Sequence, residues 1–209
     1  MSLLGKVFKK EERATNIVNF QKAELQAISE RTKNVAEEDK KATYICGLGN
    51  WGTTDQFQTA QNYSAFNVAN VKNVVNDLAK DGIQPIDKEK FASFAPNMEV
   101  MIFDAAAVKN IRKQDPKFDF SSCKAFQTGD VYLQMAYNAY YTNVEISLIN
   151  TWFIAKSVYP NLFQDVDVEA KANQVTKLFN GSELYNDIKA KPQSFGGYQK
   201  IANPTEFFQ

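Results

Sequence analysis

Residues 129–160 constrain the fold more than any other stretch, because a strand, an aromatic loop and an apolar helix follow one another directly. The segment DVYL at 130–133 follows a glycine and is rich in β-branched and aromatic residues, which predicts a short buried strand. Residues 144–158 are apolar on nearly every side, which is typical of a helix packed on several faces. A strand leading into a buried helix is the building unit of a parallel α/β sheet.

Thr142 predicts where this helix begins. Glu145 follows three residues later, so the Thr142 hydroxyl can accept a hydrogen bond from the N–H of Glu145 while the Glu145 carboxylate accepts one from the N–H of Thr142. This capping box gives Glu145 a structural role, and we exclude it from the functional candidates.

Strands and helices alternate through the rest of the chain. Buried strands are predicted at 43–49 and 99–104 and a short connection at 83–86, whereas helices are predicted at 68–78, from Asp87 to Pro96, at 105–112, at 167–179 and from Ser182 onward. The expected fold is therefore an α/β lobe, in which helices cover both faces of a parallel-type sheet in three layers.

A long helix over residues 6–34 precedes this lobe, and Ile17, Val18 and Leu25 lie on its single apolar face. About 25 helical residues span nearly 40 Å, which is more than one small domain needs. Two interpretations stay open. The helix either lies along a second body or packs on the only domain present.

Composition excludes several classes of function. The 24 basic residues balance the 24 acidic ones, so no overall positive field attracts nucleic acid. The chain has no histidine, which excludes imidazole catalysis and histidine-ligated metal, and no apolar run reaches the ~18 residues of a membrane span. Cys46 lies in a predicted strand, which favours two reduced core cysteines, but a disulfide with Cys123 stays open.

No residue pattern predicts catalysis, a cofactor or a metal site. Gly47, Gly49 and Gly52 match the letters GxGxxG, but no helix pattern begins at Gly52, so we do not expect a dinucleotide site. Residues 121–124 (SSCK) contain nucleophile and base types but lie in a connecting segment. We expect a protein that is not an enzyme.

A set of rings and amides remains as the candidate binding site, because flat apolar area with a few fixed hydrogen-bond donors suits small-molecule binding. It follows the first predicted strand and the strand at 130–133, where α/β sheets bind ligands. The candidates are Asn50, Trp51, Tyr137, Asn138, Tyr140, Tyr141 and Asn143. Simple packing of the rings in the core is the alternative.

Three segments together resemble the substrate-binding proteins of iron-complex ABC importers, the class III proteins whose two α/β lobes are joined by one long helix. Residues 87–103 (DKEKFASFAPNMEVMIF) are similar to the family's helix followed by a PDVI-type strand, and 124–132 (KAFQTGDVY) to its AVKNGKVY element. Residues 141–163 resemble its aromatic loop and last long helix. The usual Gly-His-Gly-type text is replaced by DQFQ at 55–58, which removes a histidine.

The resemblance covers only the joining helix and the C-terminal lobe. It implies that residues 1–4 are an added start, 5–40 the inter-lobe helix and linker, and 41–209 the C-terminal substrate-binding lobe. It also implies a protein outside the cytoplasm, periplasmic or lipid-anchored, that delivers an iron complex, siderophore or related metal chelate to a membrane permease and its ATPase.

By the same resemblance, Glu89 would dock on the permease, and Asn50, Trp51, Tyr137, Tyr140, Tyr141 and Asn143 would form one wall of the ligand cleft. A first-turn Glu also suits the helix dipole, so a purely structural role for Glu89 stays open. The alternative function is a stand-alone interaction module that forms a homodimer through Ile17, Val18 and Leu25.

Overall fold

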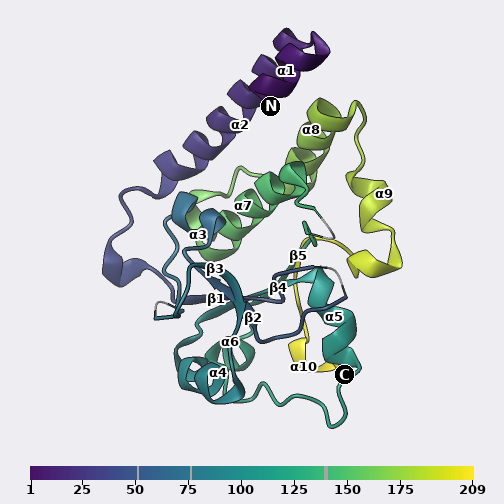
Figure 1. Cartoon of the computed structure of the whole chain (residues 1–209). Helices are drawn as coiled ribbons and strands as arrows, with labels where there is room; N and C mark the ends of the chain where they lie inside the picture. Colours follow the sequence, from purple (N-terminus) through teal and green to yellow (C-terminus); the bar gives the residue numbers. More distant parts are fainter. Residues whose placement is uncertain (51, 76, 139–140) are drawn as a thin grey trace.

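The computed structural model describes residues 1–50, 52–75, 77–138 and 141–209. Its main sheet has four strands in the order β1-β4-β5-β6 (Figure 1). β1 runs parallel to β4 and β4 parallel to β5, whereas β6 pairs antiparallel with β5. These strands are β1 (Thr43–Cys46), β4 (Val100–Asp104), β5 (Val131–Gln134) and β6 (Gln199–Lys200).

The two faces of the sheet belong to two different hydrophobic clusters. Ile45 and Ile102 pair across β1 and β4 and point into the cluster formed with the helices of one face. Their neighbours Tyr44, Met101 and Phe103 point into the cluster of the other face. Both strands are buried throughout, which explains their almost unbroken apolar sequences. The predicted sheet with helices on both faces is confirmed.

The helices divide between these clusters. The first cluster is covered by α2 (Glu11–Thr32), α3 (Ser64–Val68), α7 (Val144–Val158), α8 (Val168–Asn180) and α9 (Tyr185–Lys189). The second cluster is covered by α4 (Lys88–Phe94), α5 (Ala105–Arg112), α6 (Lys124–Thr128) and α10 (Pro204–Phe207). Short 3₁₀ turns lie at Glu37–Asp39, Ala95–Asn97, Pro160–Leu162 and Pro192–Ser194.

Local sequence sets several helix ends, and the starts at Asp87 and Asp167 were predicted. The carboxylate of Asp87 accepts a hydrogen bond from the N–H of Lys90 and so caps α4, and Asp167 caps α8 by accepting from two N–H groups of its first turn. Gly129 and Gly181 close α6 and α8 in the left-handed conformation. The prediction that Ser182 caps the last helix is wrong, because α9 begins at Tyr185 and a further helix, α10, follows.

The N-terminal helix differs from its prediction. It consists of α1 (Ser2–Phe8) and α2, separated where Lys9 adopts a left-handed conformation at φ 53°. α1 packs so tightly on α2 that a Cβ on Gly5 would lie 2.6 Å from the Cβ of Ala14. Figure 1 shows α2 rising beside α7 and α8, with α1 at its upper end.

The apolar face of α2 is used within the chain. Ile17 is buried, and Leu25 is half-buried and packed against the cluster around α7. Val18 is half-buried. This packing leaves little of the face predicted for homodimerisation free, and it agrees with the interpretation that the helix packs on the domain present.

A polar junction at Trp152 of α7 fastens α2 to the lobe. The indole N–H donates to Glu24 Oε2 at 2.8 Å, and Lys171 of α8 pairs with the same carboxylate at 2.9 Å. The Lys171 ammonium also lies 4.7 Å from the indole centroid, which adds a cation–π contact. About two turns further along α2, Arg31 makes two hydrogen bonds to Asp165, at 2.6 and 2.9 Å.

The prediction of a helix at 68–78 is wrong. The only helix here, α3, ends at Val68, and the following described residues run along the free edge of β1, where Thr43 N–H donates to Lys72 C=O at 2.8 Å and Val74 N–H to Thr43 C=O at 3.0 Å. Pairing with this strand edge satisfies backbone groups that a local helix would leave on β1 unpaired. Val71 and Val75 are still buried.

The connection predicted at 83–86 is also wrong. β3 (Gly82–Pro85) pairs antiparallel with β2 (Gln58–Gln61) in a separate two-stranded sheet. β3 is largely exposed, so its sequence lacks the apolar run by which the central strands are recognised.

The second face contains both cysteines, and they are free and buried. This observation agrees with the expectation of reduced core residues. Among the residues that the structure describes, no helix combines the length and the apolar character needed to cross a membrane.

Replacing Glu24 with Ala tests the junction between α2 and the lobe. The change leaves the Trp152 N–H without its acceptor and Lys171 without its counter-ion, so we expect the free energy of unfolding to fall by about 1–3 kcal/mol. Glu30→Ala is the matched control, because Glu30 is an exposed residue of the same helix that pairs only with Lys33, and it should change stability by less than about 0.5 kcal/mol. Urea unfolding measures both variants, and equal effects would contradict the role of the junction.

Candidate functional site

The carboxyl ends of β4 and β5 carry the candidate site. Ala105 follows β4, and Met135 follows β5, so both lie at the edge where parallel sheets bind ligands. The loop after β1 reaches the same edge, since a Cβ on Gly47 would lie 2.5 Å from the Cβ of Ala107 in α5. Gly47 also has φ +80°, so both conformation and space require glycine at this close approach.

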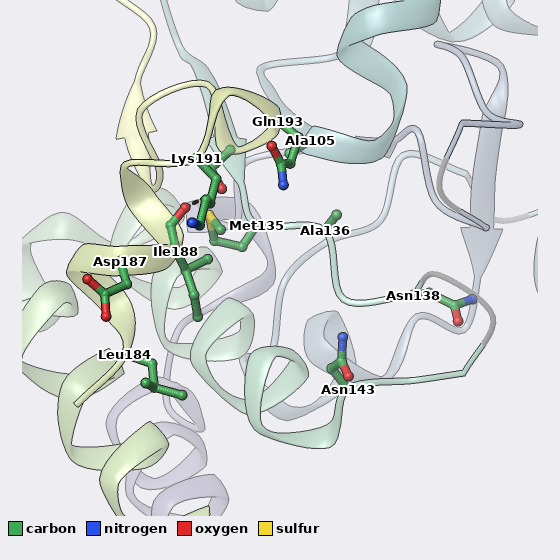
Figure 2. Close-up of a pocket in the computed structure, with 11 residues that line it drawn as sticks. Ala105, Met135, Ala136, Asn138, Asn143, Leu184, Asp187, Ile188, Lys191 and Gln193 are labelled. Carbon is green, nitrogen blue, oxygen red and sulfur yellow. Dashed lines mark hydrogen bonds between the residues drawn. The ribbon is translucent and has the colours of Figure 1, made fainter. Parts of the chain in front are cut away.

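A cavity of about 370 Å³ opens at this edge between two segments of the chain. Figure 2 shows the segment after β5 on one side and α9 with the following turn on the other. The lining combines aliphatic groups with amides, one hydroxyl, one lysine and one carboxylate. The lining residues are Ala105, Met135, Ala136, Asn138, Asn143, Leu184, Asp187, Ile188, Lys191, Gln193 and Ser194.

Backbone pairing holds the segment after β5 in place. Asn138 and Thr142 form an antiparallel bridge, and the N–H of Asn143 donates to the C=O of Tyr137 at 2.7 Å. The two amide side chains that line the cavity, of Asn138 and Asn143, therefore come from the two arms of one turn (Figure 2). Residues 139 and 140 of this turn lie outside the described residues.

The capping box predicted at Thr142 and Glu145 is wrong. α7 begins at Val144 with Asn143 as its N-cap, and no side chain caps it. Thr142 is instead engaged in the bridge to Asn138, so it lies too early in the chain to serve the first turn. The capping role that excluded Glu145 from the functional candidates is therefore absent. Glu145 still does not line the cavity.

The structure brings together only part of the predicted site. Asn143 lines the cavity together with Asn138, whereas Tyr141 points away, with 86% of its surface exposed. Tyr137 is 8% exposed, so its ring belongs mainly to the core. Asn50 is exposed in the turn after β1, where its C=O accepts from Thr53, and it does not line the cavity. The predicted residues Trp51 and Tyr140 lie outside the described residues.

Most of the cavity wall was missed by sequence reasoning, since only Asn138 and Asn143 of its lining were among the predicted residues. Leu184, Ile188 and Lys191 lie in the C-terminal part of the chain and reach the site only through the fold. Strand order provides one usable signal, because residues that directly follow buried strands, such as Ala105 and Met135, meet at one sheet edge.

A buried polar cluster lies next to the cavity in the sequence, one residue before Ala105 and Met135. Asp104 accepts from the N–H of Ala106 at 2.9 Å, and Gln134 Nε2 donates to the other Asp104 oxygen at 3.1 Å. Burial raises the pKa of Asp104 to about 7, and its two hydrogen bonds oppose that shift. Burial also raises the pKa of the nearby Tyr137 to about 12.

A second buried link supports the same segment from the side of β6. The Tyr198 hydroxyl donates to Asn150 Oδ1 at 2.6 Å, and Asn150 Nδ2 donates to the C=O of Met135 at 2.8 Å. Asn150 belongs to α7, the helix that follows the loop at 136–143, and it binds Met135, the residue that precedes this loop. The backbone at Met135 is therefore fixed by side chains that come from two other parts of the fold.

The donor set does not suit a bare metal ion. No group of three or more Cys, Asp or Glu side chains gathers anywhere in the described ranges, and the chain has no histidine. The amides, the hydroxyl and the lysine of the lining are instead groups that can donate hydrogen bonds to a polar solute, and Met135, Leu184 and Ile188 add apolar surface.

Glu89 lies apart from this cavity. It is exposed in the first turn of α4, at the end of the molecule opposite to α1 (Figure 1). It forms no ion pair with any residue in the described part of the chain, whereas its neighbour Lys90 pairs with Asp77 at 2.6 Å. The carboxylate is thus free to meet a partner.

Comparison with known proteins identifies the fold. No protein-family model matches the chain, and no curated protein sequence does. Among solved structures, an ABC transporter solute-binding protein of Sulfurospirillum deleyianum aligns with a TM-score of 0.67 and 21% identity over 89% of this chain and 57% of its own.

Two further structures agree. The molybdate periplasmic binding protein MolA of Haemophilus influenzae, bound to molybdate, aligns with a TM-score of 0.65 and 20% identity over 87% of this chain and 55% of its own. CeuE of Helicobacter pylori with a Ni-His complex aligns with a TM-score of 0.58 and 18% identity, over 86% of this chain and 57% of CeuE. The chain thus spans little more than half the length of the structures it matches. Its fold is that of a lobe of class III ABC-transporter solute-binding proteins, as the sequence resemblance predicted.

Asp104→Asn tests the buried carboxyl. The unfolded chain releases this proton near pH 4 but the folded chain holds it to about pH 7, so the free energy of unfolding falls as pH rises between these values. Asparagine keeps the N-cap and cannot ionise. Relative to wild type, the variant should gain up to about 4 kcal/mol between pH 4 and pH 8. Asp187→Asn, which removes an exposed carboxyl from the same cavity, should leave the pH profile unchanged, and a parallel profile for Asp104→Asn would contradict the assignment.

Proposed function

We propose that this chain forms one wall of the ligand cleft in the substrate-binding protein of an ABC importer. The observation that carries this proposal is the amide-lined cavity at the carboxyl ends of β4 and β5, in a fold shared with solute-binding proteins. In this assignment residues 5–40 are the inter-lobe helix and linker, and residues 41–209 are the C-terminal lobe. Solute-binding proteins are transport components, so we propose no catalytic activity.

The proposed ligand is a metal chelate, such as an iron–siderophore complex, or a related polar metal species. The solved neighbours bind different species, molybdate in MolA and a Ni-His complex in CeuE, so the likeness alone supports only a small metal-containing solute. The chain's own donors narrow the choice. They can hydrogen-bond to the outer atoms of a complex, whereas they offer no cage for a free cation.

The proposed setting follows from the same neighbours, which include a periplasmic binding protein. The complete protein would act outside the cytoplasm, in the periplasm or lipid-anchored at the cell surface. It would release its ligand to a membrane permease driven by an ATPase. Glu89 is the proposed contact with the permease, because it is an exposed carboxylate without a partner in the described structure.

Ligand titration tests the cavity. One wall buries only part of a ligand, so this chain should bind weakly, with a Kd above about 1 μM. In ¹H–¹⁵N NMR titrations with molybdate, nickel–histidine and a ferric hydroxamate chelate, at least one probe should shift the signals of Asn138 and Asn143. Asn143→Ala should weaken this binding several-fold. The control Asn161→Ala removes an exposed amide of the Pro160–Leu162 turn and should change nothing. Sub-micromolar affinity, or shifts confined to other surfaces, would contradict the proposed wall.

Uptake in cells tests Glu89. In the complete transport protein, Glu89→Gln should lower the rate of solute uptake several-fold, because a neutral amide loses the attraction to a cationic permease pocket. Ligand affinity should stay unchanged, since α4 does not line the cavity. Glu12→Gln, an exposed change in α2, is the control. Normal uptake by the Glu89 variant would refute the docking role.

A further inference from the structure

The side chain of Gln134 occupies an unusual position at the end of β5. Its Nε2 donates to Asp104 at 3.1 Å, but its Oε1 is buried without a hydrogen-bond partner among the described residues. The hydroxyl of Tyr63 is likewise buried and unpartnered, and it lies beside the Gln134 amide and the Tyr137 hydroxyl. Two unpaired polar atoms this deep are costly, so an arrangement that pairs them gains free energy.

No basic side chain among the described residues faces Asp104. The titratable groups around it come from every neighbouring element: Cys46 from β1, Tyr63 from the turn before α3, Tyr137 from the segment after β5, and Tyr198 from the turn before β6. All of them are neutral at physiological pH because burial raises the pKa of each. Only the N–H groups of Ala106 and Gln134 therefore compensate a charge on Asp104.

The Gln134 amide can pair with either protonation state of Asp104, but in opposite orientations. An ionised carboxylate only accepts, so it requires the Nε2 side of the amide, and Oε1 then faces the Tyr63 hydroxyl. In a protonated carboxyl, the oxygen that accepts from the N–H of Ala106 remains the acceptor and the oxygen beside Gln134 carries the proton, and it donates this O–H to Oε1 once the amide has rotated by half a turn. Nε2 then faces Tyr63, whose hydroxyl accepts from it and turns its own proton towards Tyr137.

We propose that Gln134 is a proton-operated positioning residue, which transmits the protonation state of Asp104 through Tyr63 to Tyr137 and to the neighbouring cavity-lining residues Met135, Ala136, Asn138 and Asn143. The proton comes from solvent, and no covalent bond between heavier atoms changes. Tyr137 is the point of transmission, because its C=O accepts from the N–H of Asn143 at 2.7 Å and its neighbour Asn138 lines the cavity. The proposal rests on the proposed function only in assigning these four cavity-lining residues to ligand binding.

The test uses NMR of the chain without ligand, so that failure of ligand binding and failure of this coupling are distinguishable. With glutamine labelled at its side-chain nitrogen, the Gln134 amide signals should titrate with a midpoint near pH 7. The backbone amides of residues 136–138 and 141–143 should follow with the same midpoint. A Gln134 amide that does not respond between pH 5 and 8.5 would overturn the proposal without any variant.

Two substitutions separate the steps. Asp104→Asn donates permanently from its own amide, so it should abolish the transition and show the low-pH signals at every pH. Gln134→Met removes the amide, so the Asp104 carboxyl should still titrate while residues 136–138 and 141–143 no longer respond. The control Glu30→Gln, which removes an exposed carboxyl of α2 outside the cavity, should retain the wild-type transition. Persistence of the transition in Asp104→Asn, or of the loop response in Gln134→Met, would refute the role of Gln134.

Discussion

The buried indole N–H of Trp152 needs an acceptor, and much of the architecture depends on how Glu24 supplies it. The hydrogen bond joins α2 to α7 in the middle of both helices. Lys171 balances the charge of Glu24, so α8 is drawn into the same junction. These contacts fix the position of α2 along α7 and α8, which the modest apolar face of α2 alone would define less well. α7, fixed in this way, contributes Asn150 to the backbone at Met135.

The site side of the molecule is governed by the opposite problem, which is that polar groups lie in the interior without enough partners. Asp104 and Gln134 end β4 and β5 at one edge of the sheet, and Tyr63, the N-cap residue of α3, lies beside Gln134. Apolar packing alone would suffice to bury these positions, and each polar atom there costs stability unless it is paired. Such groups are expected where a protein gives up stability for a specific conformation of a binding segment.

Sequence reasoning recovers the parallel strands β1, β4 and β5 because they are largely buried on both faces, and burial leaves an apolar run such as VMIF at 100–103. It misses β6, a strand of two residues that is not fully buried and has no such run. It fails where a partner distant in sequence decides the structure. The period of valines at 68–75 suits a helix, but the free edge of β1 recruits this segment as an extended neighbour. Thr142 and Glu145 have the spacing of a capping box, yet the bridge to Asn138 uses Thr142 first.

The candidate site divides in the same way. Asn138 and Asn143 are recognisable because they follow a predicted strand directly, whereas Tyr137 is polar and aromatic in sequence but packs beside Tyr63 in the core. The wall formed by Leu184, Ile188 and Lys191 has no local signal, since only the return of the chain to the sheet edge brings it there.

The two edges of the sheet have a consequence for the state of the protein at high concentration. One edge, β1, is covered by residues 72–74, and the other ends in β6, a strand of only two residues whose Lys200 pairs with Asp130 at 2.9 Å. A covered edge and a very short, charged edge offer few free backbone groups to a strand from another molecule. The main sheet is thereby protected against the edge-to-edge association that leads to amyloid-like aggregation.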